Sequence, residues 1–155
     1  MHTSKKLIAN KLCRLSFFLR HAAIEFDEVS SHIKEKKIKI SVRSIAARTK
    51  QYMNELDSQL SMLSIKCAIR ENNNKEIESS NAEYQNISDK KILELYCNSE
   101  SFFSKAYNSI LNQYFPQKPL RDMLRYQLTG IRNAFRELKL LNSVTREESM
   151  EVPLM

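Results

Sequence analysis

Residues 120–141, with the sequence LRDMLRYQLTGIRNAFRELKLL, decide the fold class of this chain. Alternating steps of four and three residues connect a mainly apolar set of positions, which are Leu120, Leu124, Gln127, Ile131, Ala134, Leu138 and Leu141. Because an α-helix advances about 3.6 residues per turn, this spacing places them all on one face. The stretch predicts an amphipathic helix that buries one side.

Three further stretches repeat this spacing, so the sequence predicts an all-α protein. We expect the four helices over about residues 4–35, 40–69, 89–115 and 119–142. The inward positions of the first three are Ile8, Leu12, Leu15, Leu19, Ala22, Phe26, Val29 and Ile33, then Val42, Ile45, Thr49, Tyr52, Leu56, Leu60, Leu63 and Cys67, and then Ile92, Tyr96, Ser99, Phe103, Ala106, Ile110 and Tyr114. Packed together, these helices predict one four-helix-bundle domain over residues 1–155.

The connections carry their own signals. Residues 71–88 are polar and rich in Asn and Ser, which predicts a long linker between two helical hairpins. We expect Ser88 to cap the third helix, with Asp89 favourable in its first turn. Pro119 suits the first turn of the fourth helix, and residues 145–155 are expected to fray.

The composition narrows the class of protein. The chain has one glycine and three prolines, so long helices are expected and a glycine-rich nucleotide loop is excluded. Its formal net charge is +7, but the basic residues are spread along the chain, so we expect no nucleic-acid partner. The densest basic cluster, residues 34–39, is interpreted as a solvated turn, with a phosphate contact site as the alternative. No apolar run is long enough for a membrane span.

The three cysteines are Cys13, Cys67 and Cys97. Their number is odd, they lie far apart and none forms a CxxC pair, so neither a disulfide framework nor a zinc site is predicted. We expect free, buried thiols in a reducing cytoplasm. The N-terminus is interpreted as the start of the first helix and not as a signal peptide.

One histidine-carboxylate pattern is a candidate metal site. A carboxylate-bridged di-iron site in a bundle uses Glu-x-x-His motifs, and the sequence contains none. However, His21, Glu25, Glu28 and His32 follow one another at steps of four, three and four residues, so they share a helix face. This set is either a solvent-facing strip of weakly interacting pairs or a surface metal site, alone or completed by a second subunit.

Polar residues also interrupt the inward faces, and they are Ser16, Gln59, Glu100 and Gln127. Glu100 is either a partly exposed carboxylate at the edge of the core or a buried ligand that pairs with Arg125 or Arg132. Gly130 lies in mid-helix, where it costs about 1 kcal/mol relative to Ala. We expect a close approach of another backbone or of a bulky side chain to explain it.

Helices three and four together resemble a known family. Residues 92–100 (ILELYCNSE), 105–107 (KAY) and 130–135 (GIRNAF), with Gln127 and Leu138, resemble an uncharacterised bacterial ferritin-like family of stand-alone four-helix bundles. The resemblance is fainter from Arg20 to Ala23 and from Arg48 to Leu60, and it covers about 100 residues in all. It implies a cytoplasmic, ferritin-like bundle built from two helical hairpins.

The metal ligands of that family are not retained. Where the family tends to have Glu in its first two helices, this chain has Ser16 and Gln59, and Phe135 stands where the family often has His. Glu100 is the one ligand position that matches. The resemblance therefore implies a member without a metal centre.

These observations favour a non-catalytic interaction or stress-associated protein without cofactor or metal. We expect a homodimer or a larger homo-oligomer that associates through apolar residues beside the core, Phe17, Phe18 and Phe102. The alternative is a ferritin-like metal-binding protein or oxidoreductase that holds iron or another divalent metal at Glu100 or at the His21–His32 strip. A third, weaker hypothesis is an electrostatic binder of nucleic acid or lipid headgroups.

Overall fold

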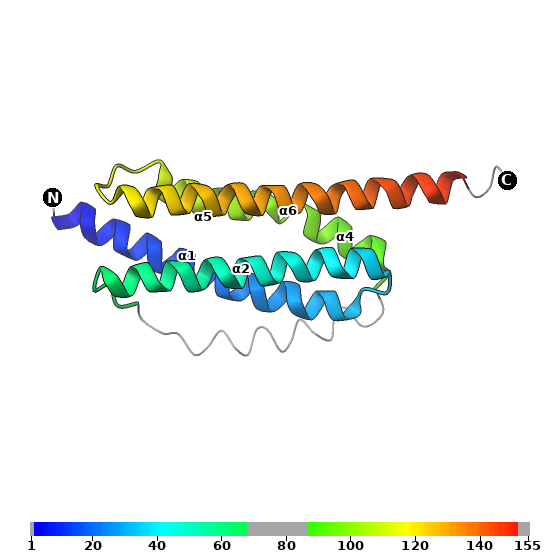
Figure 1. Ribbon diagram of the computed structural model, residues 1–155, viewed down its shortest axis with the longest axis horizontal. Coiled ribbons are helices and arrows are strands. Elements are labelled where there is room, and N and C mark those ends of the chain that lie inside the picture. Colours follow the sequence, from blue (N-terminus) through cyan, green and yellow to red (C-terminus); the bar gives the residue numbers. More distant parts are fainter. Residues whose placement is uncertain (1, 68–86, 152–155) are drawn as a thin grey trace.

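The protein is an all-helical bundle. The structure, a computed structural model, describes residues 2–67 and 87–151. Within them the helices are α1 (His2–His32), α2 (Lys36–Met62), α4 (Asp89–Cys97), α5 (Glu100–Leu111) and α6 (Lys118–Glu151). Helices α4 and α5 follow each other along one column, so the described helices pack as a four-helix bundle (Figure 1).

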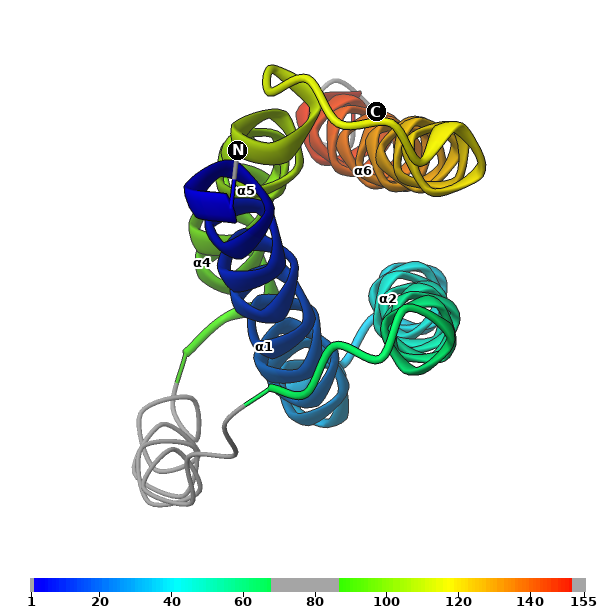
Figure 2. The ribbon, with the colours of Figure 1, turned by 90° about the vertical axis from the view of Figure 1, so that its left-hand side faces the viewer.

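Each column of the bundle packs against two neighbours. Viewed along its length, α1 lies between α2 and the α4–α5 column, and α6 completes the bundle between α2 and α5 (Figure 2). The chain runs out along α1, back along α2, in the same direction along α4 and α5, and out again along α6 (Figure 1). The expected all-α fold class and the four-column bundle are confirmed.

The expected inward faces form the core. The expected positions are buried from Leu12 to Val29 in α1 and at Ile33 just after it, from Val42 to Leu60 in α2 and from Leu120 to Leu138 in α6. Tyr114 and Leu63 are exceptions, since 85% and 37% of them are exposed. The predicted third helix was too long: α5 ends at Leu111, and the chain beyond it turns Phe115 inward instead.

The second helix ends at Met62, seven residues before the predicted end at residue 69. Ser64 adopts a positive φ of 58°, and the backbone N–H of Ile65 donates to the carbonyl of Leu60 at 2.8 Å. This is the helix-ending Schellman geometry, in which glycine usually takes the left-handed position. Because a serine takes that position here, the sequence carried no visible stop signal. The turn redirects the chain toward α1.

The predicted third helix is also broken between α4 and α5. Asn98 and Ser99 stand outside both helices, and the N–H of Ser99 donates to the carbonyl of Tyr96 at 3.0 Å, an i to i−3 bond. Asn and Ser side chains compete with the backbone for hydrogen bonds and so weaken a helix interior. The Asn98 amide and the Ser101 hydroxyl both donate to backbone carbonyls at this break.

The start of α4 is tied to the turn between α1 and α2. Ser88 caps α4 as predicted, because its side chain accepts the N–H of Lys91 at 3.3 Å. The carboxylate of Asp89 accepts the N–H groups of Lys34 and Glu35 at 2.9 and 2.8 Å. The backbone donors in the densest basic cluster therefore already bind a carboxylate of the same chain.

The remaining predictions concern helix ends and the linker. Helix α6 begins at Lys118, so Pro119 lies in its first turn as expected, but it continues to Glu151 instead of ending near 142. Helix α2 begins at Lys36, four residues before the predicted start, and the carboxylate of Glu35 caps it by accepting the N–H of Ile38 at 2.8 Å. The predicted linker 71–88 falls outside the described residues except for its last two positions.

Candidate functional site

The His21–His32 strip is only partly exposed. His21, Glu25, Glu28 and His32 are all half-buried. The hydroxyl of Tyr96 donates to Glu25 Oε1 at 2.8 Å, so this carboxylate is a hydrogen-bond acceptor for a core tyrosine of α4. Glu28 Oε2 is buried, and no hydrogen-bond donor of the described structure reaches it. Within residues 2–67 and 87–151, no three His, Cys, Asp or Glu side chains converge as a metal-binding group would.

Glu100 lies at the edge of the core. It opens α5, and the ammonium group of Lys139 on α6 donates to its Oε2 at 2.6 Å. The Glu100 side chain is 25% exposed. This geometry matches the expected partly exposed carboxylate, but its partner is Lys139 and not Arg125 or Arg132.

The interior at this level of the bundle is filled by aromatic rings. Phe26 packs against Tyr96 and Phe135, with ring centroids 5.3 and 5.8 Å apart, and Phe103 lies 5.6 Å from Phe135 and 4.9 Å from Phe18. Aromatic contacts of this kind contribute about 0.5–1.5 kcal/mol each beyond their buried area. Phe135, at the position where the family resemblance implies His, is fully buried among them.

The residues present do not fit the di-metal centre of a ferritin-like bundle. Metal ions of that kind require carboxylate oxygens and imidazole nitrogens directed at one point. Ser16 instead bonds to Asp57, Glu100 bonds to Lys139, and Phe135 offers a ring without a ligand atom.

A second interior layer is polar and fully bonded. Gln127 is completely buried, and its Oε1 accepts the hydroxyl of Tyr107 at 2.8 Å. Its Nε2 donates to the carbonyl of Tyr52 at 3.2 Å and to Glu55 Oε1 at 3.1 Å. Burial raises the pKa of the Tyr107 phenol, and the neighbouring Tyr52 and Glu55 raise it further. The layer ties α2, α5 and α6 together by side-chain bonds.

Gly130 is explained by the same layer. A Cβ at this position would overlap the hydroxyl of Tyr52 and would stand 3.1 Å from its Cζ atom. The guanidinium of Arg48 also donates to the Gly130 carbonyl at 2.9 Å. The expectation that a bulky side chain approaches this glycine closely is confirmed.

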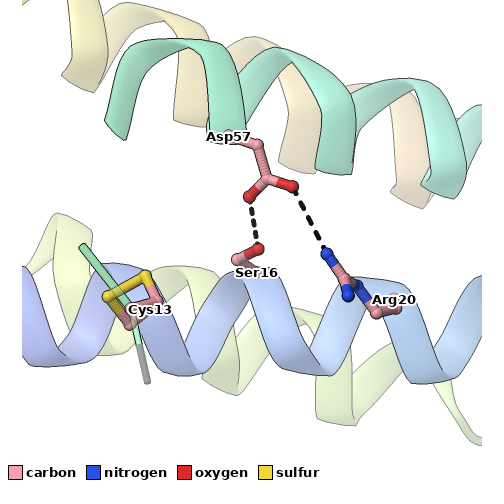
Figure 3. A network of polar contacts seen from close by, with 5 residues as sticks. Cys13, Ser16, Arg20 and Asp57 are labelled. Atoms are coloured by element: carbon pink, nitrogen blue, oxygen red, sulfur yellow. Dashed lines mark hydrogen bonds and ion pairs between the residues drawn. A yellow bond between two sulfur atoms is a disulfide. The ribbon is translucent and has the colours of Figure 1, made fainter. Parts of the chain in front are cut away.

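The two helices of the first hairpin are joined by a covalent bond and by a polar cluster (Figure 3). Cys13 of α1 and Cys67 after α2 form a disulfide across 54 residues, with Cα atoms 5.5 Å apart. One turn further along α1, the Ser16 hydroxyl donates to Asp57 Oδ1 at 2.5 Å, and Arg20 lies 3.8 Å from the other oxygen.

The prediction of free thiols at Cys13 and Cys67 was wrong. The chain reversal at Ser64 returns residue 67 to α1, and spacing along the sequence does not reveal that reversal. Cys97 is the free cysteine, and burial raises the pKa of its thiol. Asp57, which satisfies the buried Ser16, was also missed, since it lies off the predicted inward face of α2.

A cleft lies between α1 and the α4–α5 column. Its volume is about 460 Å³, and aromatic and aliphatic side chains line most of it. Its polar lining comes from His21, Glu25 and Ser99. Phe102 and Leu95 also line it, and they are 61% and 52% exposed.

The three phenylalanines expected on an apolar surface are separated by the structure. Phe102 is exposed, Phe18 lies half-buried in the same cleft, and Phe17 is half-buried on the Asp57 side of α1. Phe18 packs against the core through Phe103. Only Phe102 therefore presents most of its surface to solvent.

Comparison of the chain with protein-family models, with curated proteins and with solved structures finds no match. The resemblance to ferritin-like bundles therefore remains an expectation beyond the four-helix architecture itself. Among the described residues, no helix combines the length and the apolar character needed to cross a bilayer.

Proposed function

We propose that this protein is a non-catalytic helical bundle that associates with a second copy of itself through the cleft beside Phe102. The supporting observation is the exposed pair Phe102 and Leu95 at a cleft of about 460 Å³. Apolar side chains clustered in this way mark interaction sites more often than scattered surface residues do. We also propose that the bundle is ferritin-like and lacks the metal ligands of that fold.

A two-fold dimer uses the same patch on both copies. Phe102 is both a lining residue of the cleft and an exposed side chain, so each copy offers an apolar group and a site to receive one. The cleft polar groups, His21 and Glu25, stand beside this apolar surface and supply hydrogen-bonding capacity to it.

The test is the molar mass in solution across a wide range of protein concentration, measured by sedimentation velocity. The native protein is expected to dimerise, and Phe102→Ser is expected to remain a monomer. Leu140→Ser is the matched control, because Leu140 is 60% exposed but lies on α6 outside the cleft. A monomeric native protein, or a dimer that survives Phe102→Ser with its affinity unchanged, contradicts the proposal.

The alternative function, metal binding at the strip, is favoured by one observation, the buried and unpartnered Glu28 Oε2. Metal analysis of protein purified without a tag tests it. Stoichiometric iron, manganese or zinc that is lost in both Glu28→Gln and His21→Ala would support this alternative over the non-metal proposal. A protein without stoichiometric metal would remove it.

A cytoplasmic location is also proposed from the sequence, and the Cys13–Cys67 disulfide is the observation that opposes it. Disulfides are rare in the reducing cytoplasm and persist in oxidising compartments. Alkylation of thiols at the moment of cell lysis, followed by mass spectrometry, is expected to label Cys13 and Cys67 in a cytoplasmic protein. A fully oxidised pair in the cell would contradict the cytoplasmic location.

A further inference from the structure

Helix α6 carries a row of six basic side chains along its length, and we call it the basic row. Its members are Lys118, Arg121, Arg125, Arg132, Arg136 and Lys139. Their steps are three, four, seven, four and three residues. With about 100° of turn per residue, these positions fall within an arc of about 60°, and they extend over about 32 Å of helix.

The basic row lies on an exposed flank of α6, beside its buried face. The buried face of α6 is marked by Leu124, Ile131 and Leu138, which are at most 1% exposed. The centre of the basic row lies about 110° around the helix from the centre of that face. Helix α6 lies at a corner of the bundle, beside α5 and α2 (Figure 2), and Arg125, Arg132 and Arg136 of the row are exposed.

The charges of the row are largely unneutralised. Among the described residues, Lys139 is the member with a carboxylate within 4.0 Å, that of Glu100. The guanidinium of Arg121 stands 5.3 Å from the centroid of the Phe115 ring, and Arg125, Arg132 and Arg136 are exposed.

The acidic residues of this part of α6 do not interrupt the row. Asp122 and Glu137 are the acidic residues between positions 118 and 139. Both lie outside the 60° arc that the basic row occupies. The row therefore concentrates on one side of one helix much of the charge behind the net value of +7.

We propose that the basic row binds the phosphate backbone of a duplex nucleic acid without reading its sequence. Four of the six side chains are arginines, whose planar guanidinium groups bind phosphate oxygens in pairs. Arg121 and Arg125 are about 6 Å apart along the helix, as are Arg132 and Arg136. A duplex carries about one negative charge per 1.7 Å of its axis, so a row of this length meets many phosphates.

The residues around the basic row favour a duplex over a lipid surface or a single strand. A helix that lies in a membrane interface inserts an apolar face, but the apolar face of α6 is buried in the bundle. Single-stranded nucleic acid is bound by basic grooves with interleaved aromatic side chains. The exposed aromatic residue of α6, Tyr126, lies outside the arc of the basic row. We therefore expect the row to contact only the phosphates of a duplex, and such contacts carry no sequence information.

This proposal differs from the expectation drawn from the sequence. Read as a linear string, the basic residues of α6 never stand side by side, so they appear dispersed. The helix places them on one side over six turns. The row is recognised only when each basic residue is assigned to a face of the helix.

The test is fluorescence anisotropy of a labelled duplex of mixed sequence at a series of salt concentrations. Six phosphate contacts predict an affinity that falls about 10³-fold between 50 and 200 mM salt. The triple variant Arg125→Gln/Arg132→Gln/Arg136→Gln is expected to bind more weakly and to lower the slope of log K against log salt by about 3.

A second triple variant removes the same charge elsewhere. Lys36→Gln/Lys50→Gln/Lys90→Gln changes three exposed lysines on α2 and α4 and is expected to retain most of the affinity and the original slope. Far-ultraviolet circular dichroism establishes that both variants are folded.

Several results would overturn the proposal. One is an equal loss of duplex affinity in the two triple variants, which would indicate a general charge effect. Another is the absence of duplex binding near 50 mM salt, the condition that most favours phosphate contacts. Co-sedimentation with phosphatidylserine vesicles in the absence of duplex binding would assign the row to a membrane surface instead. These results leave the dimer proposal untouched, because the cleft and the basic row share no residue.

Discussion

The two halves of the bundle are built differently. The α1–α2 hairpin consists of continuous helices of 31 and 27 residues that are joined by a disulfide and by the Ser16–Asp57 bond. The column opposite is interrupted, with α4 and α5 only 9 and 12 residues long. Helices that short gain their stability from packing and not from their own hydrogen bonds. The comparison indicates that the hairpin is the scaffold and that the α4–α5 column depends on its neighbours.

The largest expected effect concerns the covalent bond of the hairpin. In the chain-entropy account, a disulfide that closes 54 residues restricts the unfolded chain by about 4 kcal/mol. The double variant Cys13→Ser/Cys67→Ser is expected to lose about that much free energy of unfolding, measured by urea denaturation. Cys97→Ser is the control and should change little. An unchanged midpoint in the double variant would show that the hairpin does not depend on its disulfide.

The next effect concerns the polar layer that holds α5 against its neighbours. Gln127→Met keeps the size of the side chain but leaves the buried hydroxyl of Tyr107 without its acceptor, at an expected cost of about 2 kcal/mol. Adding Tyr107→Phe removes the unsatisfied hydroxyl and should recover part of the loss. Gln113→Met, at an exposed position just after α5, serves as the control in the same thermal melts. Additive losses in the double variant would show that the two groups are not coupled.

The smallest effect concerns the contact between the hairpin and α6. Gly130→Ala gains helix propensity but forces the Tyr52 hydroxyl aside, so we expect a net loss of about 1 kcal/mol. Combining it with Tyr52→Phe removes the overlapping oxygen and should relieve part of the cost. A simple stabilisation of about 1 kcal/mol by Gly130→Ala alone would mean that the tyrosine moves away freely.

Much of the fold followed from spacing, and the failures have local causes. The inward positions from Leu12 to Ile33 are buried as predicted, because burial along a regular helix repeats with its period. The ends of helices were predicted less well. Ser64 takes a left-handed conformation that normally marks a glycine, and the break at Asn98 and Ser99 lies inside an otherwise regular apolar pattern.

The candidate sites were predicted in part. The exposure of Phe102 and the close approach at Gly130 follow from their positions beside or within an inward face. Two other bonds were not predicted, from Tyr96 to Glu25 and from Ser16 to Asp57. Each joins two different helices, and spacing within one helix does not reveal which residues of another helix it meets.

The sequence by itself determined that this chain folds into amphipathic helices and which side of each helix is buried, because that information repeats every three to four residues. Only the tertiary structure decided which residues distant in the chain meet: Cys13 with Cys67, Gln127 with Tyr107, and Glu100 with Lys139. Such pairs depend on how whole helices are rotated and shifted against one another. The packing of all the inward faces sets those rotations together, and no single stretch of sequence encodes them.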